Sequence, residues 1–98
     1  GVPILAAFGG PAIELSWQPN TEADLAGYNI YRSEPPKPRD GGGYQRRNAK
    51  LIPGPAYRDD MVEAGKTYSY AVAAVDRAGN ESEPSAEATA SVPAEQQP

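Results

Sequence analysis

The 98-residue sequence contains neither cysteine nor histidine. Without cysteine, no disulfide and no thiolate-bound zinc can hold the fold together, so hydrophobic packing must suffice. Without histidine, the chain lacks the commonest general base, the commonest neutral metal ligand and the usual pH switch. We therefore predict that the protein is not an enzyme and uses no cofactor.

A long apolar run is also missing. No stretch approaches the roughly 18 consecutive apolar residues of a membrane span, and the start at Gly1 lacks the basic and apolar segments of a signal peptide. The net charge of -4, from 13 acidic and 9 basic residues, disfavours general binding to nucleic acid or anionic membranes. We expect a soluble piece of a longer protein, with neither nucleic acid nor a membrane as its partner.

Segments 13–17 and 67–75 show the period of two that is typical of half-buried strands. Segment 28–32 is rich in aromatic and β-branched residues and follows Gly27, which predicts a third strand with Tyr28 and Ile30 on one face. Successive side chains of a strand point to opposite faces, so the apolar ones gather on one side. An exposed Trp17 would suggest stacking against sugars, but its position in phase with its apolar neighbours favours burial. The predicted core is Ile13, Leu15, Trp17, Tyr28, Ile30, Tyr68, Tyr70, Val72 and Ala74.

The alanine-rich segment 85–92 is predicted to be a strand, with a helix as the alternative. Its strict alternation favours the strand, because a helix would turn the polar residues to every side. Pro84 just before it suits an edge strand, where a missing N–H matters little. With weaker candidates at 4–8, 44–48 and 56–58, the chain has about seven short strands and no convincing helix, which predicts an all-β sandwich.

Turn-forming residues separate the predicted strands, and one connection, residues 35–43, is long. It combines prolines with glycines, so we expect an exposed loop with a stiff first half and a mobile second half. The segment 94–98 carries no large apolar side chain and is predicted to begin a C-terminal linker. One domain over residues 1–93 would precede it.

Five motifs run over nearly the whole chain: Ile13-x-Leu15-x-Trp17, Asp24–Ser33, Tyr57-Arg58-Asp59, Gly65–Tyr68 and Val72–Ser82. Together they resemble the fibronectin type III family in the form found in bacterial extracellular multidomain proteins. The resemblance implies an immunoglobulin-like sandwich of about seven antiparallel strands in two sheets. It also implies a non-catalytic spacer or presenter of a larger secreted or cell-surface protein, whose partners are neighbouring domains of the same polypeptide.

The same resemblance implies structural roles for Trp17, Tyr28 and Tyr68. Tyr68 occupies the position of the family's tyrosine corner, whose hydroxyl bonds to the backbone just upstream, here at Ala64 or Gly65. Integrin binding is not implied, because the last hairpin has Asp76-Arg77-Ala78-Gly79-Asn80 in place of an Arg-Gly-Asp tripeptide.

The middle of the chain carries the possible ligand or partner surface: Tyr31, Arg32, Tyr44, Arg46, Arg47 and Lys50. Exposed aromatic rings beside guanidinium groups bind polysaccharides, acidic glycans or proteins. This interpretation makes the chain a carbohydrate- or anionic-ligand-binding module. In the alternative, the basic side chains on an edge strand only prevent sheet-to-sheet aggregation, and the module is purely structural.

Adjacent carboxylates occur at Asp59 and Asp60, but neighbours on a strand point to opposite faces and cannot share a catalytic site. We expect surface and turn roles for both. A calcium site is the remaining metal hypothesis, because loops at one end of the sandwich offer oxygen ligands. Against it, these ligands do not follow an ordered spacing such as that of an EF-hand loop. Solubility is the simpler explanation of these acidic loops, which contain Glu22, Asp24, Asp76, Asn80 and Glu81.

Overall fold

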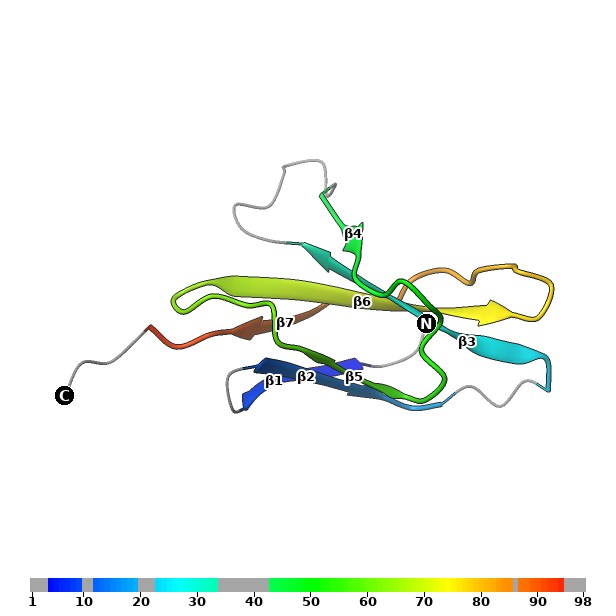
Figure 1. Ribbon diagram of the computed structural model, residues 1–98, viewed down its shortest axis with the longest axis horizontal. Coiled ribbons are helices and arrows are strands. Elements are labelled where there is room, and N and C mark those ends of the chain that lie inside the picture. Colours follow the sequence, from blue (N-terminus) through cyan, green and yellow to red (C-terminus); the bar gives the residue numbers. More distant parts are fainter. Residues whose placement is uncertain (1–3, 10–11, 20–22, 34–42, 86, 95–98) are drawn as a thin grey trace.

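The computed structural model describes residues 4–9, 12–19, 23–33, 43–85 and 87–94 of the chain. In these ranges all regular structure is β-strand, arranged in two sheets that lie one above the other (Figure 1). The predicted all-β sandwich is thereby confirmed. No helix within these ranges is long and apolar enough to cross a membrane.

The first sheet has three antiparallel strands in the order β1-β2-β5. The hairpin of β1 and β2 aligns Phe8 with Ile13, and β2 then aligns Leu15 with Tyr57 of β5. All three strands correspond to predicted segments. Their bounds are Ile4–Gly9 for β1, Ala12–Trp17 for β2 and Ala56–Asp59 for β5.

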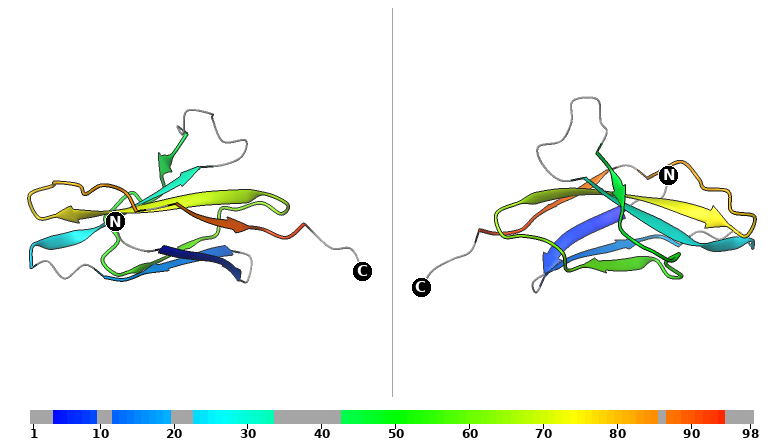
Figure 2. Two further views of the ribbon diagram at one scale, coloured as in Figure 1. Left: turned by 180° about the vertical axis from the view of Figure 1, so that it is seen from behind. Right: turned by 45° about the horizontal axis from the view of Figure 1, so that its top comes forward.

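The second sheet has four antiparallel strands in the order β4-β3-β6-β7. Its centre is the long pair of β3 and β6, which aligns Ile30 with Val72. The chain changes sheet three times, and Figure 2 shows the two resulting layers from behind and with the top tilted forward. The bounds are Gln45–Arg46 for β4, Leu25–Ser33 for β3, Thr67–Asp76 for β6 and Ala88–Ser91 for β7.

The core lies between the sheets and contains every residue that the alternation predicts to be inside. Trp17 is 7% exposed and packs edge-on against Tyr28, with ring centroids 5.2 Å apart and planes at 71°. The alternative of an exposed, sugar-stacking Trp17 is therefore wrong. The buried cluster is Ile13, Leu15, Trp17, Tyr28, Ile30, Tyr68, Tyr70, Val72, Ala74, Ala90 and Val92.

Strand β7 confirms the strand interpretation of the alanine-rich segment against the helix alternative. Ala90 and Ala88 pair with Tyr68 and Tyr70 of β6, so small side chains lie beside large rings. This pairing lets both tyrosines bury fully without crowding. Glu22, most of the predicted loop 35–43 and the linker residues 95–98 lie outside the described residues.

Tyr68 bonds to the backbone just upstream, as the family resemblance implies, but its partner is a different residue. Its hydroxyl accepts a hydrogen bond of 2.8 Å from the N–H of Glu63, and neither Ala64 nor Gly65 takes this part. Gly65 has a φ of +82°, and its N–H donates instead to the carbonyl of Val92 at 3.0 Å. The turn at Gly65 thus directs its amide away from the ring.

Candidate functional site

The structure divides the predicted basic surface into an interior part and an exposed part. Arg32 is 8% exposed, and its guanidinium forms a salt bridge of 2.8 Å with Asp59. The same nitrogen, Nη1, donates to the carbonyl of Met61 at 2.8 Å. The prediction that Arg32 belongs to an exposed ligand surface is therefore wrong, because its position on β3 is in phase with the buried Tyr28 and Ile30.

Asp59 is the partner that holds this charge in the interior, so the surface or turn role predicted for it is also wrong. Its side chain is 1% exposed and accepts hydrogen bonds from the hydroxyl of Tyr70 at 2.7 Å and from Arg32. Burial acts to raise the pKa of Asp59, but the bonds from Tyr70 and Arg32 outweigh it and hold the pKa below its usual value. Asp60 is exposed, as predicted.

The interior ion pair connects the two sheets, because Asp59 ends β5 while Arg32 lies on β3. The guanidinium also lies 4.8 Å from the centre of the Tyr68 ring, within the range of a cation–π interaction. These groups serve the fold and are not accessible to a ligand. Sequence reasoning missed them because it placed charged residues outside by rule, although both lie on the inward phase of their strands.

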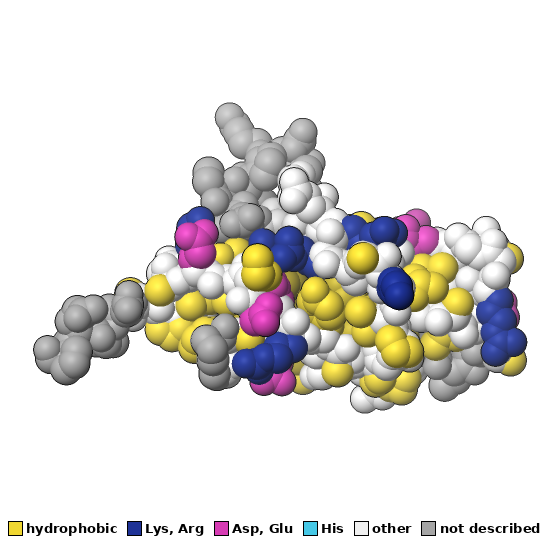
Figure 3. Space-filling model, in the orientation of Figure 1, with side chains coloured by type: hydrophobic (Ala, Val, Ile, Leu, Met, Phe, Trp, Pro, Cys, Tyr) yellow, Lys and Arg dark blue, Asp and Glu magenta, His cyan; other side chains and the backbone are white. Residues whose placement is uncertain are grey.

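The exposed part of the basic surface is dispersed. Arg47 is only 23% exposed and lies 3.8 Å from Asp59, whereas Arg46 and Lys50 are exposed. On the face seen in Figure 3, Lys and Arg side chains are scattered, and acidic side chains lie beside several of them. The described residues on this face form no continuous positive patch for an anionic polymer.

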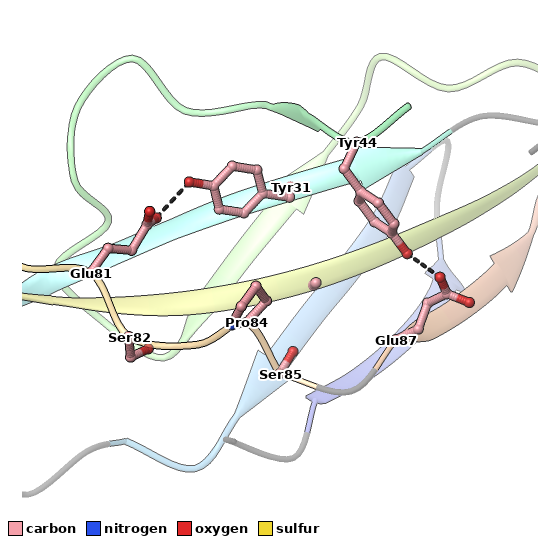
Figure 4. A pocket seen from close by; sticks show the side chains of 8 residues that line it. Tyr31, Tyr44, Glu81, Ser82, Pro84, Ser85 and Glu87 are labelled. Atoms are coloured by element: carbon pink, nitrogen blue, oxygen red, sulfur yellow. Dashed lines mark hydrogen bonds between the residues drawn. The ribbon is translucent and has the colours of Figure 1, made fainter. Parts of the chain in front are cut away.

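Tyr31 and Tyr44 instead line a groove on the outer face of the second sheet, together with carboxylates that the sequence did not associate with them (Figure 4). The groove has a volume of about 320 Å³. Tyr31 and Ala71 are cross-strand neighbours of β3 and β6 at its floor. Its lining residues are Tyr31, Tyr44, Ala71, Glu81, Ser82, Pro84, Ser85 and Glu87.

Each tyrosine hydroxyl in the groove donates to a carboxylate. Tyr31 bonds to Oε2 of Glu81 at 2.5 Å, and the same oxygen accepts from the side-chain amide of Asn29 at 3.0 Å. Tyr44 bonds to Glu87 from the other side of the groove. The bond with Glu81 raises the pKa of Tyr31, while the bonds from Tyr31 and Asn29 lower the pKa of Glu81. Burial and the bond to Glu87 raise the pKa of Tyr44.

In the acidic loop after β6, the oxygens of Asp76 bond to groups of the same loop. The carboxylate of Asp76 accepts from the N–H groups of Ala78 and Asn80 at 2.9 Å each, and from the side chain of Asn80 at 3.2 Å. These bonds close a turn and lower the pKa of Asp76. Among the described residues, no three acidic side chains lie close enough to form a metal site.

The two antiparallel sheets and the tyrosine corner define a fibronectin type III-like module. The chain belongs to the fibronectin type III-like family: it is 31% identical to a solved Fn3-like protein from Clostridium thermocellum, with a TM-score of 0.72. That alignment covers 97% of this chain and 93% of the other. No family model matches the chain.

Other relatives are large bacterial proteins of which this chain matches a small part. An amylopullulanase from Thermoanaerobacterium saccharolyticum is 39% identical over 87 residues, which are 89% of this chain and 6% of the amylopullulanase. A solved β-1,2-glucanase from Parabacteroides distasonis is 34% identical with a TM-score of 0.66, over 87% of this chain and 11% of the glucanase. The chain is thus similar to one module within multidomain enzymes.

Proposed function

We propose that the chain is a non-catalytic module that spaces or presents neighbouring domains of a larger, secreted polysaccharide-degrading protein. The observation that carries this proposal is its similarity to a 6% portion of an amylopullulanase, together with the match to part of a β-1,2-glucanase. The matched segment has the length of one domain, so the catalytic residues of those enzymes would lie in their other domains.

The chemistry of the described residues supports a structural role. Among the described residues, the most deeply buried carboxylate is that of Asp59, which is 1% exposed and is held by Arg32 and Tyr70. Catalysis of glycoside hydrolysis needs two carboxyl groups across a cleft with room for a sugar and, in one class, a water. In the tyrosine-lined groove each carboxylate instead accepts a hydrogen bond from a tyrosine hydroxyl.

The test has two parts. The isolated chain is incubated with soluble starch and with a β-1,2-glucan, and we expect no release of reducing sugar. The module is then deleted from a multidomain enzyme that carries it. The kcat of the shortened enzyme for a short soluble substrate should stay the same, whereas its stability or its action on a polymeric substrate should change. Turnover by the chain alone would contradict the proposal.

A second candidate function, binding of a carbohydrate or anionic ligand, retains support from one observation. Two of the residues predicted for it, Tyr31 and Tyr44, line the same groove. Of the basic residues predicted with them, Arg46 and Lys50 are exposed but are not part of its lining, and Arg47 is largely buried. The groove thus favours an aromatic contact surface over a basic one.

A further inference from the structure

The groove lined by Tyr31 and Tyr44 has one preformed wall. The segment that follows β6 forms one wall, and its backbone is bonded to β6: the N–H of Ser82 donates to Ala74 and that of Ser85 to Val72, each at 2.8 Å. The hydroxyls of the same two serines accept bonds from the N–H groups of Ala74 and Val72 at 2.9 and 3.0 Å. Such a wall needs little ordering when a ligand binds.

The apolar surface of the groove consists of rings. Tyr31 and Tyr44 are both partly exposed, and Figure 4 shows Pro84 between the two tyrosine–carboxylate pairs. Ala71 lies at the floor and adds no bulk. Pockets of about 300 Å³ and above hold small ligands, mostly through apolar and aromatic contacts with a few placed polar groups. The groove is therefore suited to a ligand of one or two rings with an apolar face.

The polar groups of the groove are hydrogen-bond acceptors. Glu81 receives its bonds from Tyr31 and Asn29 on the same oxygen, Oε2, and no bond to its other oxygen comes from a described residue. Glu87 lies on the opposite side, next to Tyr44. A carboxylate accepts from several donors at once, so both side chains suit a ligand rich in hydroxyl groups. Their negative charge opposes an anionic ligand.

We propose that this groove binds a short stretch of a neutral oligosaccharide, with pyranose rings on Tyr31 and Tyr44 and hydroxyls donating to Glu81 and Glu87. The choice of a sugar over a peptide rests on the proposed function, a module of a polysaccharide-degrading protein. A basic, proline-rich peptide would also meet rings and carboxylates in such a groove. The chemistry differs from the anionic ligand expected from sequence, because the carboxylates and not the arginines line the site.

The experiment is a titration of the ¹⁵N-labelled chain followed by amide chemical shifts. The probes are maltohexaose and cellohexaose as neutral sugars, trigalacturonate as an acidic sugar, and a synthetic basic proline-rich peptide. We expect saturable shifts with a neutral sugar at the amides of Tyr31, Ala71, Ser82 and Ser85, with an apparent Kd in the millimolar range or below. The acidic sugar and the peptide should give weaker effects at the same amides.

Variants locate the site. Tyr44→Ala should weaken binding of the neutral sugar about tenfold, the size expected when a central aromatic contact is removed. Phe8→Ala is the matched control, because Phe8 is a partly exposed aromatic residue on β1 in the other sheet. This variant should bind the neutral sugar as tightly as the unchanged chain does. Tyr44→Phe keeps the ring and should retain most of the affinity. If Tyr44→Ala does not fold, Tyr31→Ala removes the other ring.

Absence of saturable shifts at the groove with both neutral sugars would overturn the proposal, as would tighter binding of the acidic sugar or of the peptide. Equal loss of affinity in Phe8→Ala and Tyr44→Ala would place the ligand elsewhere. None of these results would contradict the spacer role, which needs no ligand and is tested by deletion of the module.

Discussion

Arg32 and Asp59 bring opposite charges into the interior, one from each sheet. Asp59 accepts three hydrogen bonds, from the hydroxyl of Tyr70, from Arg32 and from the N–H of Met61 at 3.2 Å. Removal of two charges from water is expensive, and their attraction compensates only when such additional bonds satisfy the remaining lone pairs. The ion pair is therefore sensitive to the loss of one partner.

The variant Asp59→Asn should lower the free energy of unfolding by about 3 to 5 kcal/mol, because the charge of Arg32 then remains buried without its partner. Urea unfolding followed by tryptophan fluorescence measures this change. Asp60→Asn is the matched control, since the neighbouring carboxylate is exposed, and its effect should stay within about 0.5 kcal/mol. Equal effects of the two variants would contradict the role of Asp59 as the buried partner of Arg32.

Tyr68 allows a smaller effect to be isolated. Tyr68→Phe removes the hydroxyl that accepts from the Glu63 N–H at 2.8 Å but keeps the ring under Arg32. The free energy of unfolding should fall by about 0.5 to 1.5 kcal/mol, the net value of one hydrogen bond, with an unchanged far-UV circular dichroism spectrum. An unchanged melting temperature would show that the hydroxyl contributes nothing to the corner.

At this scale the sequence predicts apolar burial well and polar burial poorly. Trp17, Tyr28 and Tyr68 lie in the core as their alternation indicates. Arg32 and Asp59 obey the same alternation, but the general rule that charges are exposed conceals them. These two residues, 27 positions apart, meet only because the two sheets pack face to face, and local sequence patterns do not specify how the sheets pack.

Strand β3 depends on a close approach of the segment that follows β4. Tyr28 and Ile52 exchange backbone hydrogen bonds of 2.9 and 3.0 Å, which brings this segment against Gly27. A Cβ placed on Gly27 would lie 2.8 Å from the Cβ of Leu51 and 3.0 Å from the carbonyl oxygen of Ile52. Since one neighbour is backbone, the segment must move to admit any side chain.

Gly27→Ala should therefore lower the free energy of unfolding by about 1 to 3 kcal/mol through overpacking. Thermal unfolding by calorimetry measures the change. Gly54→Ala is the control: Gly54 has nothing within 4 Å of an added Cβ, so its substitution should be neutral or slightly stabilising. A melting temperature of Gly27→Ala equal to that of Gly54→Ala would exclude the close approach.

At the scale of elements, the period of two in the sequence is enough to predict the strands but not the groove. Segments 13–17, 28–32 and 67–75 all lie within observed strands, because alternation is a local property. Tyr31 and Glu81 are 50 positions apart, and Tyr44 and Glu87 are 43 apart. Their meeting depends on the irregular path of the chain after β6, for which no sequence periodicity exists.

For the whole molecule, the absence of histidine and cysteine has a consequence for stability. No side chain with an ordinary pKa titrates between about pH 6 and pH 8. The shifts found in Tyr31 and Tyr44 are upward, farther from this range. The free energy of unfolding should thus be nearly constant around neutral pH, and its main dependence on pH should come from carboxylates.

Acidification should unfold the module, with Asp59 as a principal cause. The pKa of Asp59 is lower in the folded protein than in the unfolded chain, so the unfolded chain binds more protons at acidic pH and stability rises with pH. The contribution is complete above the unfolded pKa of about 4 and is lost as the pH falls through the lower folded value. Glu81 shifts in the same direction and adds to the effect. Urea midpoints measured from pH 7 to pH 2 should fall mainly below pH 4 in the natural chain and in Asp60→Asn, and less steeply in Asp59→Asn; parallel profiles of all three would exclude Asp59 as the cause.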